Sequence, residues 1–362
     1  DWIAIDAGTQ FCDPSYVGIE QMLPDLDLLS EYRGRIHAIL ITHGHEDHIG
    51  SAAHVAATLN APVYATAFVV ELIRLKESEY GTVERPTLNV VAPGDELSFG
   101  PMKVRYLPVT HSIPDACAIA IDTPSGTIVH TGDFKMDATP VAGPAFDPAP
   151  FRDLGKRGVR MLLSDSTNAQ VPGHTRSEKD VVTDLADLMD DAPGRVIISM
   201  FASNVNRVRG LAEAAQRSGR RVAMVGRSLS LYLEASVRAG LGPTITKMVD
   251  PQRLDLVDDD RILILCTGSQ AEPRSALFRA SNQDHQSLRI KPGDTIVLSS
   301  RIIPGNERSI HRMVGNLTRL GARVLHAGIA SVHGSGHAQQ DELKEMIALT
   351  QASAALGDWR LT

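Results

Sequence analysis

Residues 36–50 read IHAILITHGHEDHIG and combine an apolar run with a dense cluster of potential metal ligands. An apolar strand is expected over residues 36–41, and four side chains of metal-binding type follow it closely: His43, His45, Asp47 and His48. Because alternate residues of an extended segment point the same way, the imidazoles of His43 and His45 face one point. Asp47 and His48, at the start of a helix, face a second point nearby. Imidazole and carboxylate groups suit Zn²⁺ or Mn²⁺, so the stretch predicts a metal site.

Two further ligand candidates end strands in the same half of the chain. His111 follows an apolar run that ends in Val109-Thr110, and Asp133 follows Gly132. A lone histidine is more often a surface residue with its hydrogen bonds satisfied than a metal ligand. Four clustered ligand-type side chains have no structural use that would offset the cost of their desolvation, so metal binding is the better interpretation of the cluster. Asp6 ends the first apolar run and fits a carboxylate that orients a ligand histidine.

The composition excludes several classes of protein. The chain has 362 residues, of which 43% are hydrophobic and 4% aromatic, and 36 Lys+Arg against 43 Asp+Glu leave a net charge of −7. The apolar content is too high for a disordered chain, and no run approaches the ~18 consecutive apolar residues of a membrane span. The acidic total argues against a uniformly basic nucleic-acid coat, so a polyanionic partner must be held locally, by a metal or a small cationic pocket.

The cysteines indicate a reducing compartment. Cys12, Cys117 and Cys266 are far apart, odd in number and outside any CxxC spacing, which argues against a disulfide framework. The cytoplasm is therefore the expected location. The chain opens inside an apolar run without a Met, so residues are expected to precede it.

The first half of the chain alternates short apolar runs with turn residues, which predicts sheets covered by helices. A helix is expected over residues 49–59, where apolar side chains recur at near-helical spacing, and a long surface loop over residues 140–150. The predicted strands are residues 2–6, 36–42, 62–65, 102–107, 118–122, 127–131 and 161–164.

From about Ser177 strands and helices alternate, which predicts a parallel, doubly wound sheet with its ligand site at the carboxyl ends of the strands. The loops at those ends are polar and small, and each is expected to open a helix whose N–H groups can bind an anion. These loops are FASN at 201–204, GRS at 226–228, TGSQ at 267–270 and PGNE at 304–307. The expected strands are 195–200, 221–225, 261–266 and 295–299, and the expected helices are 204–218 and 228–239.

Together these motifs resemble a known family. HGHEDH with a later His and a Gly-Asp pair is similar to the metallo-β-lactamase superfamily. The later segments, in their order, resemble the β-CASP nucleases, and most closely the bacterial ribonuclease J family: SDSTNA at 164–169, the four loops above with IPGNE at 303–307, and VHGSGHA at 332–338. The resemblance implies an α/β fold in which a metallo-β-lactamase αββα sandwich, residues 1–176, carries an inserted β-CASP domain with a doubly wound parallel sheet, residues 177–341. Residues 342–362 would begin the return into the first domain.

The family pattern implies two divalent metal ions, with zinc expected and manganese served by the same ligands. His43, His45 and His111 would hold one ion, Asp47 and His48 the other, and Asp133 would bridge both. In the family a further histidine, in a PVHGE-like segment beyond the HxSGH motif, completes the second site. Residues 355–362 contain no histidine, so either this sequence ends before that element or the second site is incomplete.

The implied reaction is hydrolysis of RNA phosphodiesters by a hydroxide that the two ions activate. The family acts as an endonuclease and as a 5′-to-3′ exonuclease on 5′-monophosphate RNA, in rRNA processing and mRNA decay. The expected catalytic residues are Asp47, Asp165 and His337. By resemblance, the residues that grip a phosphate near the cut are Ser203, Asn204, Ser335 and His337. Helix capping or turn formation explains either serine equally well.

Two other interpretations stay open. One is a hydrolase on the same metal scaffold that acts on a small thioester or lactam, against which the anion-binding loops of the second half count. The other is a catalytically weak paralogue that binds RNA. The resemblance also implies a homo-oligomer, a dimer or tetramer, with RNA and other RNA-decay proteins as partners and no membrane association.

Overall fold

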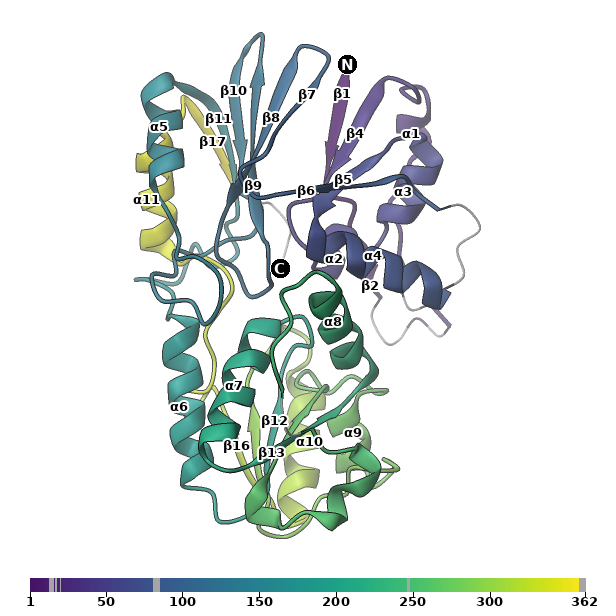
Figure 1. The fold of residues 1–362 in the computed structure, drawn as a ribbon, viewed down its shortest axis with the longest axis vertical. Helices are drawn as coiled ribbons and strands as arrows, with labels where there is room; N and C mark the ends of the chain where they lie inside the picture. Colours follow the sequence, from purple (N-terminus) through teal and green to yellow (C-terminus); the bar gives the residue numbers. More distant parts are fainter. Residues whose placement is uncertain (13–15, 17, 20, 81–84, 246–247, 358–362) are drawn as a thin grey trace.

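The computed structural model describes residues 1–362 except 13–15, 17, 20, 81–84, 246–247 and 358–362. The last five residues of the predicted returning segment therefore lie outside the described part of the chain. The ribbon forms two layered units, one above the other in Figure 1. No helix of the described residues is both long and apolar enough to cross a membrane.

Two sheets face each other in the upper unit of Figure 1. One has four parallel strands in the order β1 (Trp2–Ile5), β4 (Ile36–Leu40), β5 (Val63–Thr66) and β6 (Leu88–Val91). The other is mixed, in the order β17 (Ala354–Gly357), β11 (Val159–Ser164), β10 (Gly126–His130), β9 (Cys117–Thr123), β8 (Met102–Pro108) and β7 (Glu96–Phe99). Side chains from both sheets, among them Leu40, Tyr106 and Ile119, form the core between them.

Helices cover the outer face of each sheet, which confirms the predicted αββα sandwich. The first sheet carries α1 (Asp27–Ser30), α2 (Glu46–Ile49), α3 (Ala52–Leu59) and α4 (Ala67–Tyr80). The second carries α5 (Ala149–Arg157) and α11 (Gln340–Thr350), which pack side by side. A short antiparallel pair, β2 (Gln10–Phe11) and β3 (Gln21–Met22), lies outside both sheets.

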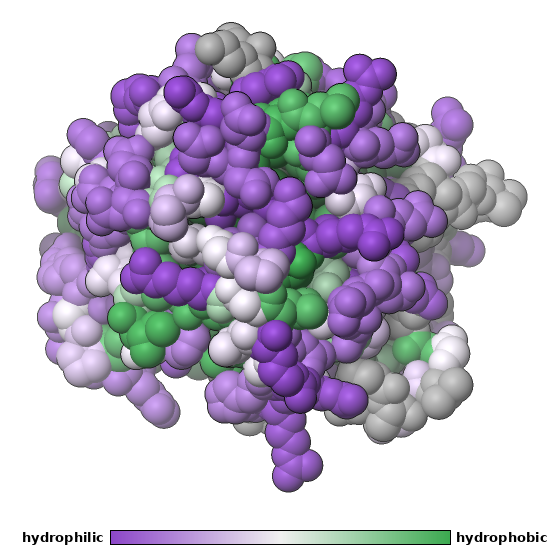
Figure 2. Space-filling model, turned by 90° about the horizontal axis from the view of Figure 1, so that it is seen from below, coloured by the Kyte–Doolittle hydropathy of each residue, from purple (hydrophilic) through white to green (hydrophobic). Residues whose placement is uncertain are grey.

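The lower unit is a five-stranded, wholly parallel sheet between two layers of helices, as predicted. Its order is β13 (Arg221–Val225), β14 (Ile262–Cys266), β12 (Val196–Ser199), β15 (Thr295–Leu298) and β16 (Arg323–His326). One face packs against α6 (Glu178–Asp190), α7 (Val205–Arg217) and α8 (Arg227–Arg238), and the other against α9 (Ala276–Ser281) and α10 (Glu307–Arg319). Two 3₁₀ helices, Pro251–Leu256 and Asp259–Arg261, precede β14. Figure 2 shows that the end of the molecule seen from below is mostly hydrophilic, with separate apolar patches.

The prediction of one continuous helix over residues 49–59 is wrong, because α2 ends at Ile49 and α3 starts at Ala52. At the break, backbone groups of the loop after β1 form hydrogen bonds with the chain on both sides. Ala7 N–H donates to the His48 carbonyl at 2.7 Å, and Ser51 N–H donates to the Ala7 carbonyl at 2.9 Å. This loop comes from a distant part of the chain, so helical spacing alone does not reveal the break.

Two smaller predictions also need correction. The TGSQ loop does not open a helix, because a further turn follows it and α9 starts only at Ala276; the buried Gln270 side chain instead bonds the Arg301 carbonyl at 2.8 Å. The predicted surface loop over 140–150 ends earlier, since α5 starts at Ala149. Strand ends differ by one or two residues. The domain limits at residues 176 and 341 stay predictions.

The two units share an apolar core as well as two chain crossings. Val205, Tyr232 and Ala235, from α7 and α8 of the lower unit, belong to the buried cluster formed by the helices over the first upper sheet. The chain then returns through α11, and β17 joins the edge of the second sheet in parallel with β11. The two units are therefore packed against each other rather than tethered by linkers.

A buried ion pair fixes α6 to α7 beside the crossing. The Arg207 guanidinium donates to both oxygens of Glu178, at 2.6 and 2.9 Å, and the two side chains are only 2% and 7% exposed. Arg207 also donates to the Ser299 carbonyl at 2.9 Å, so one side chain joins two helices and a strand end.

We predict that Glu178→Gln destabilises the fold by about 3–5 kcal/mol, because it leaves the Arg207 charge buried without its carboxylate. Urea unfolding followed by circular dichroism measures the loss. The double variant Glu178→Gln/Arg207→Met removes the stranded charge and should recover part of the stability. If the double variant loses as much unfolding free energy as Glu178→Gln, or more, the proposed coupling between the two side chains is contradicted.

Candidate metal centre

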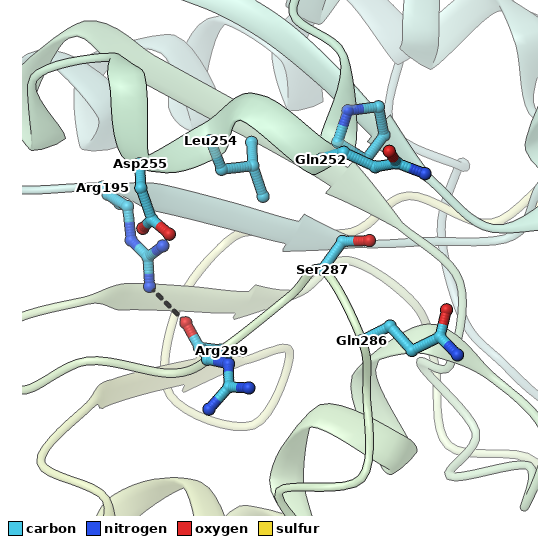
Figure 3. Close-up of a pocket in the computed structure, with 8 residues that line it drawn as sticks. Arg195, Gln252, Leu254, Asp255, Gln286, Ser287 and Arg289 are labelled. Carbon is cyan, nitrogen blue, oxygen red and sulfur yellow. Dashed lines mark hydrogen bonds between the residues drawn. The ribbon is translucent and has the colours of Figure 1, made fainter.

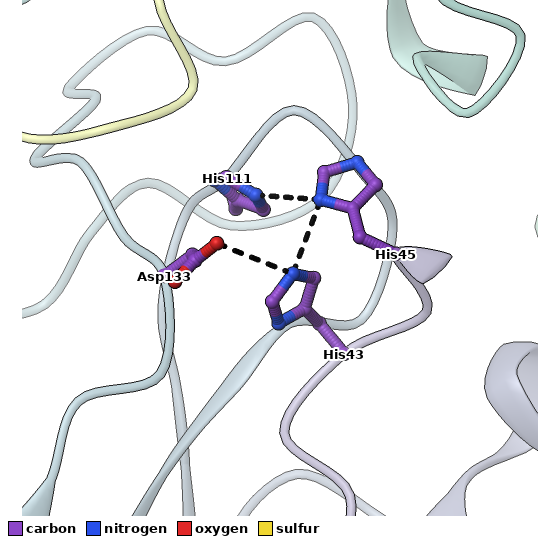
Figure 4. Close-up of side chains that lie close together, drawn as sticks. All are labelled: His43, His45, His111 and Asp133. Atoms are coloured by element: carbon purple, nitrogen blue, oxygen red, sulfur yellow. Dashed lines mark hydrogen bonds and ion pairs between the residues drawn. The ribbon is translucent and has the colours of Figure 1, made fainter. Parts of the chain in front are cut away.

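The predicted ligands follow the ends of neighbouring strands, at one edge of the two facing sheets. His43 and His45 lie just beyond β4, His111 beyond β8, Asp133 beyond β10 and Asp165 beyond β11. Figure 4 shows His43, His45, His111 and Asp133 converging from three of these segments. One ligand atom from each of these four residues lies within 4.8 Å of the others.

The ring nitrogens of the three histidines face one another closely. His43 Nε2 lies 3.1 Å and His111 Nε2 lies 3.0 Å from His45 Nδ1. His43 Nε2 is also 3.7 Å from Asp133 Oδ2. Ligands about 2.0–2.1 Å from a tetrahedral zinc ion stand about 3.3–3.4 Å apart, so this spacing is close to that of a zinc site.

The outer nitrogen of each ring is held by another group, which determines where the proton sits. His111 Nδ1 donates to the Gly336 carbonyl at 2.7 Å, so its Nε2 carries the lone pair. His43 Nδ1 donates to Thr42 Oγ1 at 3.0 Å, and Thr42 Oγ1 in turn donates to Asp6 at 2.8 Å. His45 Nε2 contacts Ser203 Oγ at 3.1 Å. The lone pairs of His43 and His111 are thus aimed at the side of His45 Nδ1, which favours a cation there.

Burial keeps these three imidazoles neutral. It lowers the pKa of His43 well below its usual value and lowers the pKa of His45 and of His111 to about 3. Neutral imidazole is the form that ligates a metal. For Asp133, burial acts to raise the pKa, but the neighbouring His48 and His43 outweigh it and hold that pKa well below its usual value.

Asp133 is shared by two further groups. It stands with Asp47 and His48, and separately with Asp165 and His337, each group having ligand atoms within 4.8 Å of one another. His48 Nε2 lies 3.2 Å from Asp133 Oδ2 and 3.6 Å from Asp47 Oδ2. His337 Nδ1 bonds Asp165 Oδ2 at 2.9 Å. Of the eight predicted metal-ligand and catalytic side chains, the structure therefore brings the other seven, His337 among them, around the Asp133 carboxylate.

Asp6 organises this group from behind. Its Oδ2 accepts from His48 Nδ1 at 2.7 Å and from Thr42 Oγ1 at 2.8 Å, and its Oδ1 accepts from the Thr42 N–H at 2.8 Å. Burial opposes a charge on His48, but Asp6 and Asp133 outweigh it and raise the pKa of His48 well above its usual value. The geometry matches the orienting role expected for Asp6.

Glycines permit two close approaches at the site. Gly132 has φ +57°, and a Cβ there would lie 2.9 Å from Thr42 Cβ, so the chain reaches Asp133 through a turn that other residues would strain. A Cβ on Gly336 would lie 2.5 Å from Ser112 Oγ and 2.8 Å from His111 Cε1. The 333–337 loop therefore lies directly against a ligand histidine.

The predicted phosphate-binding residues come from two loops of the lower unit. Ser203 contacts His45, as described above, whereas Asn204 is buried and its Oδ1 caps α7 by accepting from the Arg207 N–H at 3.0 Å. The structure thus gives Asn204 Oδ1 a capping role and leaves the Nδ2 amide hydrogens for a ligand. Ser335 Oγ accepts from the His337 N–H at 3.1 Å within the second loop.

The sequence did not single out Asn168, which bonds the second loop, or Arg301, which bonds Asn168. Asn168 Nδ2 donates to Ser335 Oγ at 2.9 Å and to the His337 carbonyl at 3.2 Å, and its Oδ1 accepts from Arg301 Nη1 at 2.9 Å. Asn168 lies inside the quoted SDSTNA motif, and Arg301 is the one charged residue between Ile296 and Gly305. The motif and the isolated charge are the sequence features that could have identified these two residues.

A polar cavity of about 240 Å³ lies at the opposite edge of the lower sheet (Figure 3). Its Arg195 side chain donates to Asp294 at 2.8 and 2.6 Å and to the Arg289 carbonyl at 2.6 Å. Arg195 therefore stabilises the start of β12, and the cavity is separate from the histidine cluster.

The residues present fit divalent metal ions. Asp6, Asp47, Asp133 and Asp165 bring four carboxylates close to the cluster, in which His43, His45 and His111 are neutral, and this negative charge favours cations there. Nitrogen and oxygen donors suit zinc and manganese alike. The group around His43 has four ligand atoms, whereas the group around Asp47 has three among the described residues.

An αββα sandwich with this cluster at the strand ends defines a protein of the metallo-β-lactamase superfamily. Residues 12–174 match the family model of the metallo-beta-lactamase superfamily, and residues 193–317 match that of the ribonuclease J beta-CASP domain. Together the two models cover most of the chain, so the chain is similar to ribonuclease J in both of its units.

Several proteins named ribonuclease J align with almost all of the chain. Ribonuclease J 1 of Streptococcus pyogenes serotype M3 is 39% identical over 348 residues, 96% of this chain and 62% of that protein. Ribonuclease J of Sinorhizobium meliloti is 38% identical over 345 residues, 95% of this chain and 61% of that protein. The chain thus spans about three-fifths of the length of these relatives. A crystal structure of a protein of unknown function from Enterococcus faecalis V583 has a TM-score of 0.64 at 16% identity, covering 99% of this chain and 88% of that one, which shows a shared fold.

We predict that Asp6→Asn lowers metal affinity by about 10- to 100-fold, because it weakens the hold on His48 and on the Thr42–His43 pair. Competitive titration with a chelating dye measures the change. Glu345→Gln is the matched control, since Glu345 is exposed and bonds His174 at 2.7 Å on the surface. Unchanged affinity in Asp6→Asn would contradict the orienting role.

Proposed function

We propose that the chain is a metal-dependent ribonuclease that hydrolyses RNA phosphodiesters, with zinc or manganese as its cofactor. We further propose that it cuts both internally and from the 5′ end, with preference for a 5′-monophosphate. The main support is that one carboxylate, Asp133, belongs to three convergent groups of ligand side chains. Two ions held there would polarise the phosphoryl oxygens and supply a nucleophile at neutral pH.

His337 is placed to act on the departing oxygen. Its Nδ1 donates to Asp165 at 2.9 Å, which fixes the ring and leaves Nε2 free to hold a proton. The side chain is 27% exposed, so it is accessible to a substrate, while Asp165 is fully buried. We assign His337 the role of proton donor to the 3′ oxygen and Asp165 that of its positioning partner.

Ser335 supports the predicted phosphate grip through its hydrogen bonds. Its Oγ accepts from two N–H groups, those of Asn168 Nδ2 at 2.9 Å and His337 N at 3.1 Å. Both lone pairs are therefore used, and the hydroxyl hydrogen remains for an anion. Ser203, at 3.1 Å from His45, supplies a second hydroxyl beside the ligand cluster.

The direct test uses the full-length protein, stripped of metal and reloaded with Zn²⁺ or Mn²⁺. Two RNAs that differ only in a 5′-phosphate or a 5′-hydroxyl are incubated with it, and the products are mapped. We expect products with 5′-phosphate and 3′-hydroxyl ends and faster shortening of the 5′-phosphorylated RNA. Absence of cleavage with both ions would sink the proposal, and binding without cleavage would favour the RNA-binding alternative.

Asp133→Ala should abolish cleavage, with a loss of at least about a thousandfold, and lower the metal content per chain, because it removes a ligand common to both sites. Initial rates and elemental analysis measure the two effects together. Asp153→Ala is the control, since Asp153 is exposed and pairs only with Lys156 at 3.1 Å among the described residues. Retained activity in Asp133→Ala would refute the bridging role.

Ser335→Ala should reduce 5′-to-3′ shortening more than internal cleavage, by about tenfold, because only the terminal reaction depends on gripping the end phosphate. The two rates are compared on one RNA labelled at its 3′ end. Ser331→Ala, an exposed serine in the same segment, is the control. Equal loss of both rates would show that Ser335 does not serve the 5′ phosphate.

A further inference from the structure

Glu46 is the acidic residue of the HGHEDH stretch that the ligand cluster does not use. It begins α2, between the ligand candidates His45 and Asp47. Its side chain belongs to none of the groups of ligand atoms that the described residues form. Carboxylates are metal ligands in their own right, so a carboxylate in this position would compete for the ions unless other groups hold it.

Lys76 of α4 holds the Glu46 carboxylate from one side. Its Nζ donates to Glu46 Oε1, across 30 positions of the chain. The two side chains are only 16% and 28% exposed, so this ion pair is shielded from water more than a pair on the open surface. The negative charge of Glu46 is therefore balanced within the protein.

Tyr232 of α8 approaches the same carboxylate from the lower unit. Tyr232 is buried, and Lys76 Nζ lies 6.0 Å from the centre of its ring, at the outer range of a cation–π contact. Burial is the main cause that raises the pKa of the Tyr232 hydroxyl well above its usual value. The Glu46 carboxylate, which accepts a hydrogen bond from this hydroxyl, adds to the rise. The three side chains thus form one cluster that spans both units.

The face of α4 that carries Lys76 also packs on the backbone of the ligand turn. Phe68, Leu72 and Lys76 are four residues apart, so they lie along one face of the helix. A Cβ on Gly44 would lie 3.3 Å from Phe68 Cε1 and 3.3 Å from Leu72 Cδ2. The centres of the Phe68 and Tyr232 rings are 6.5 Å apart, where α4 meets α8 at the junction of the two units in Figure 1. The ligand turn is therefore supported by α4, and α4 by α8.

We propose that Lys76 and Tyr232 are positioning residues of the metal site: they hold the Glu46 carboxylate away from the ions and so direct His45 and Asp47 toward them. The inference rests on the metal site of the proposed function and does not depend on the substrate. Without these partners the Glu46 carboxylate would be drawn to the ions, and the backbone that carries both ligands would shift with it. The lower unit thus supports, through Tyr232, a metal site whose ligands belong to the upper unit.

The test titrates Co²⁺ into metal-free protein and follows the visible absorption of the bound ion, which depends on its ligand geometry. We expect Lys76→Met to weaken Co²⁺ binding by about tenfold or more and to change the spectrum, because Glu46 loses its cation. Lys76→Arg keeps the positive charge, so it should restore most of the affinity and the parent spectrum. Tyr232→Phe removes only the hydroxyl and should change the spectrum with a smaller loss of affinity.

Lys156→Met is the matched control, because Lys156 is an exposed lysine on α5 that pairs with Asp153 at 3.1 Å. Thermal unfolding of the metal-free variants measures any loss of stability separately from metal binding. Unchanged Co²⁺ affinity and spectrum in Lys76→Met would overturn the proposal and leave Lys76 a structural role alone. Equal losses in Lys76→Arg and Lys76→Met would also overturn it.

A double variant tests whether Lys76 acts through Glu46. Once Glu46→Gln has removed the competing carboxylate, adding Lys76→Met should cause little further loss of Co²⁺ affinity. The full tenfold loss in that background would overturn the proposal. RNA cleavage enters none of these measurements, so failure of the positioning role leaves the ribonuclease proposal to its own test, and the reverse holds as well.

Discussion

The Asp6 carboxylate is the constraint on which the rest of the site depends. Asp6 sits at the end of β1 with φ +59°, a left-handed conformation that costs a non-glycine residue about 1–2 kcal/mol. Three bonds at 2.7–2.8 Å offset that strain, and they determine the position of His48 directly and of His43 through Thr42. The same loop supplies Ala7, whose backbone breaks the following helix and lets His48 turn inward. The parallel pairing of β1 with β4 is what brings Asp6 to this place, so fold and site are one arrangement.

The 333–337 loop connects the two units at the site. Its Gly336 carbonyl holds His111 at 2.7 Å, Ser335 is bonded by Asn168 at 2.9 Å, and the Gly334 carbonyl accepts from Arg207 at 3.4 Å. The lactamase-like unit provides the ligand cluster and Asn168, and the lower unit provides Arg207, so both units hold this loop. Asn168 belongs to the upper unit and Arg301 to the lower one, so their hydrogen bond also joins the two units beside this loop. The shared core around Tyr232 holds the same two units together by apolar contact.

The parts predicted well from the sequence depend on local spacing. The histidines and Asp47 of residues 43–48 are neighbours in the chain, and His111 and Asp133 follow apolar strands. Their convergence follows because β4 of one sheet and β8 and β10 of the facing sheet end on the same side. The parts not predicted depend on contacts between distant residues. Asn168 meets Ser335 across 167 positions and Arg301 across 133, and periodicity carries no signal for such pairs. The break at residues 50–51 was missed for the same reason, since Ala7 causes it.

Charge distribution explains how an acidic chain can be suited to RNA. A net charge of −7 repels a polyanion at long range, but screening limits that repulsion to about 8 Å at physiological ionic strength. Within that distance the site would bring two divalent ions. Arg207, Lys135 and Arg195 are engaged in buried ion pairs, so these three side chains add no free positive charge to the surface. Bound metal ions would supply locally the positive charge that the chain as a whole lacks.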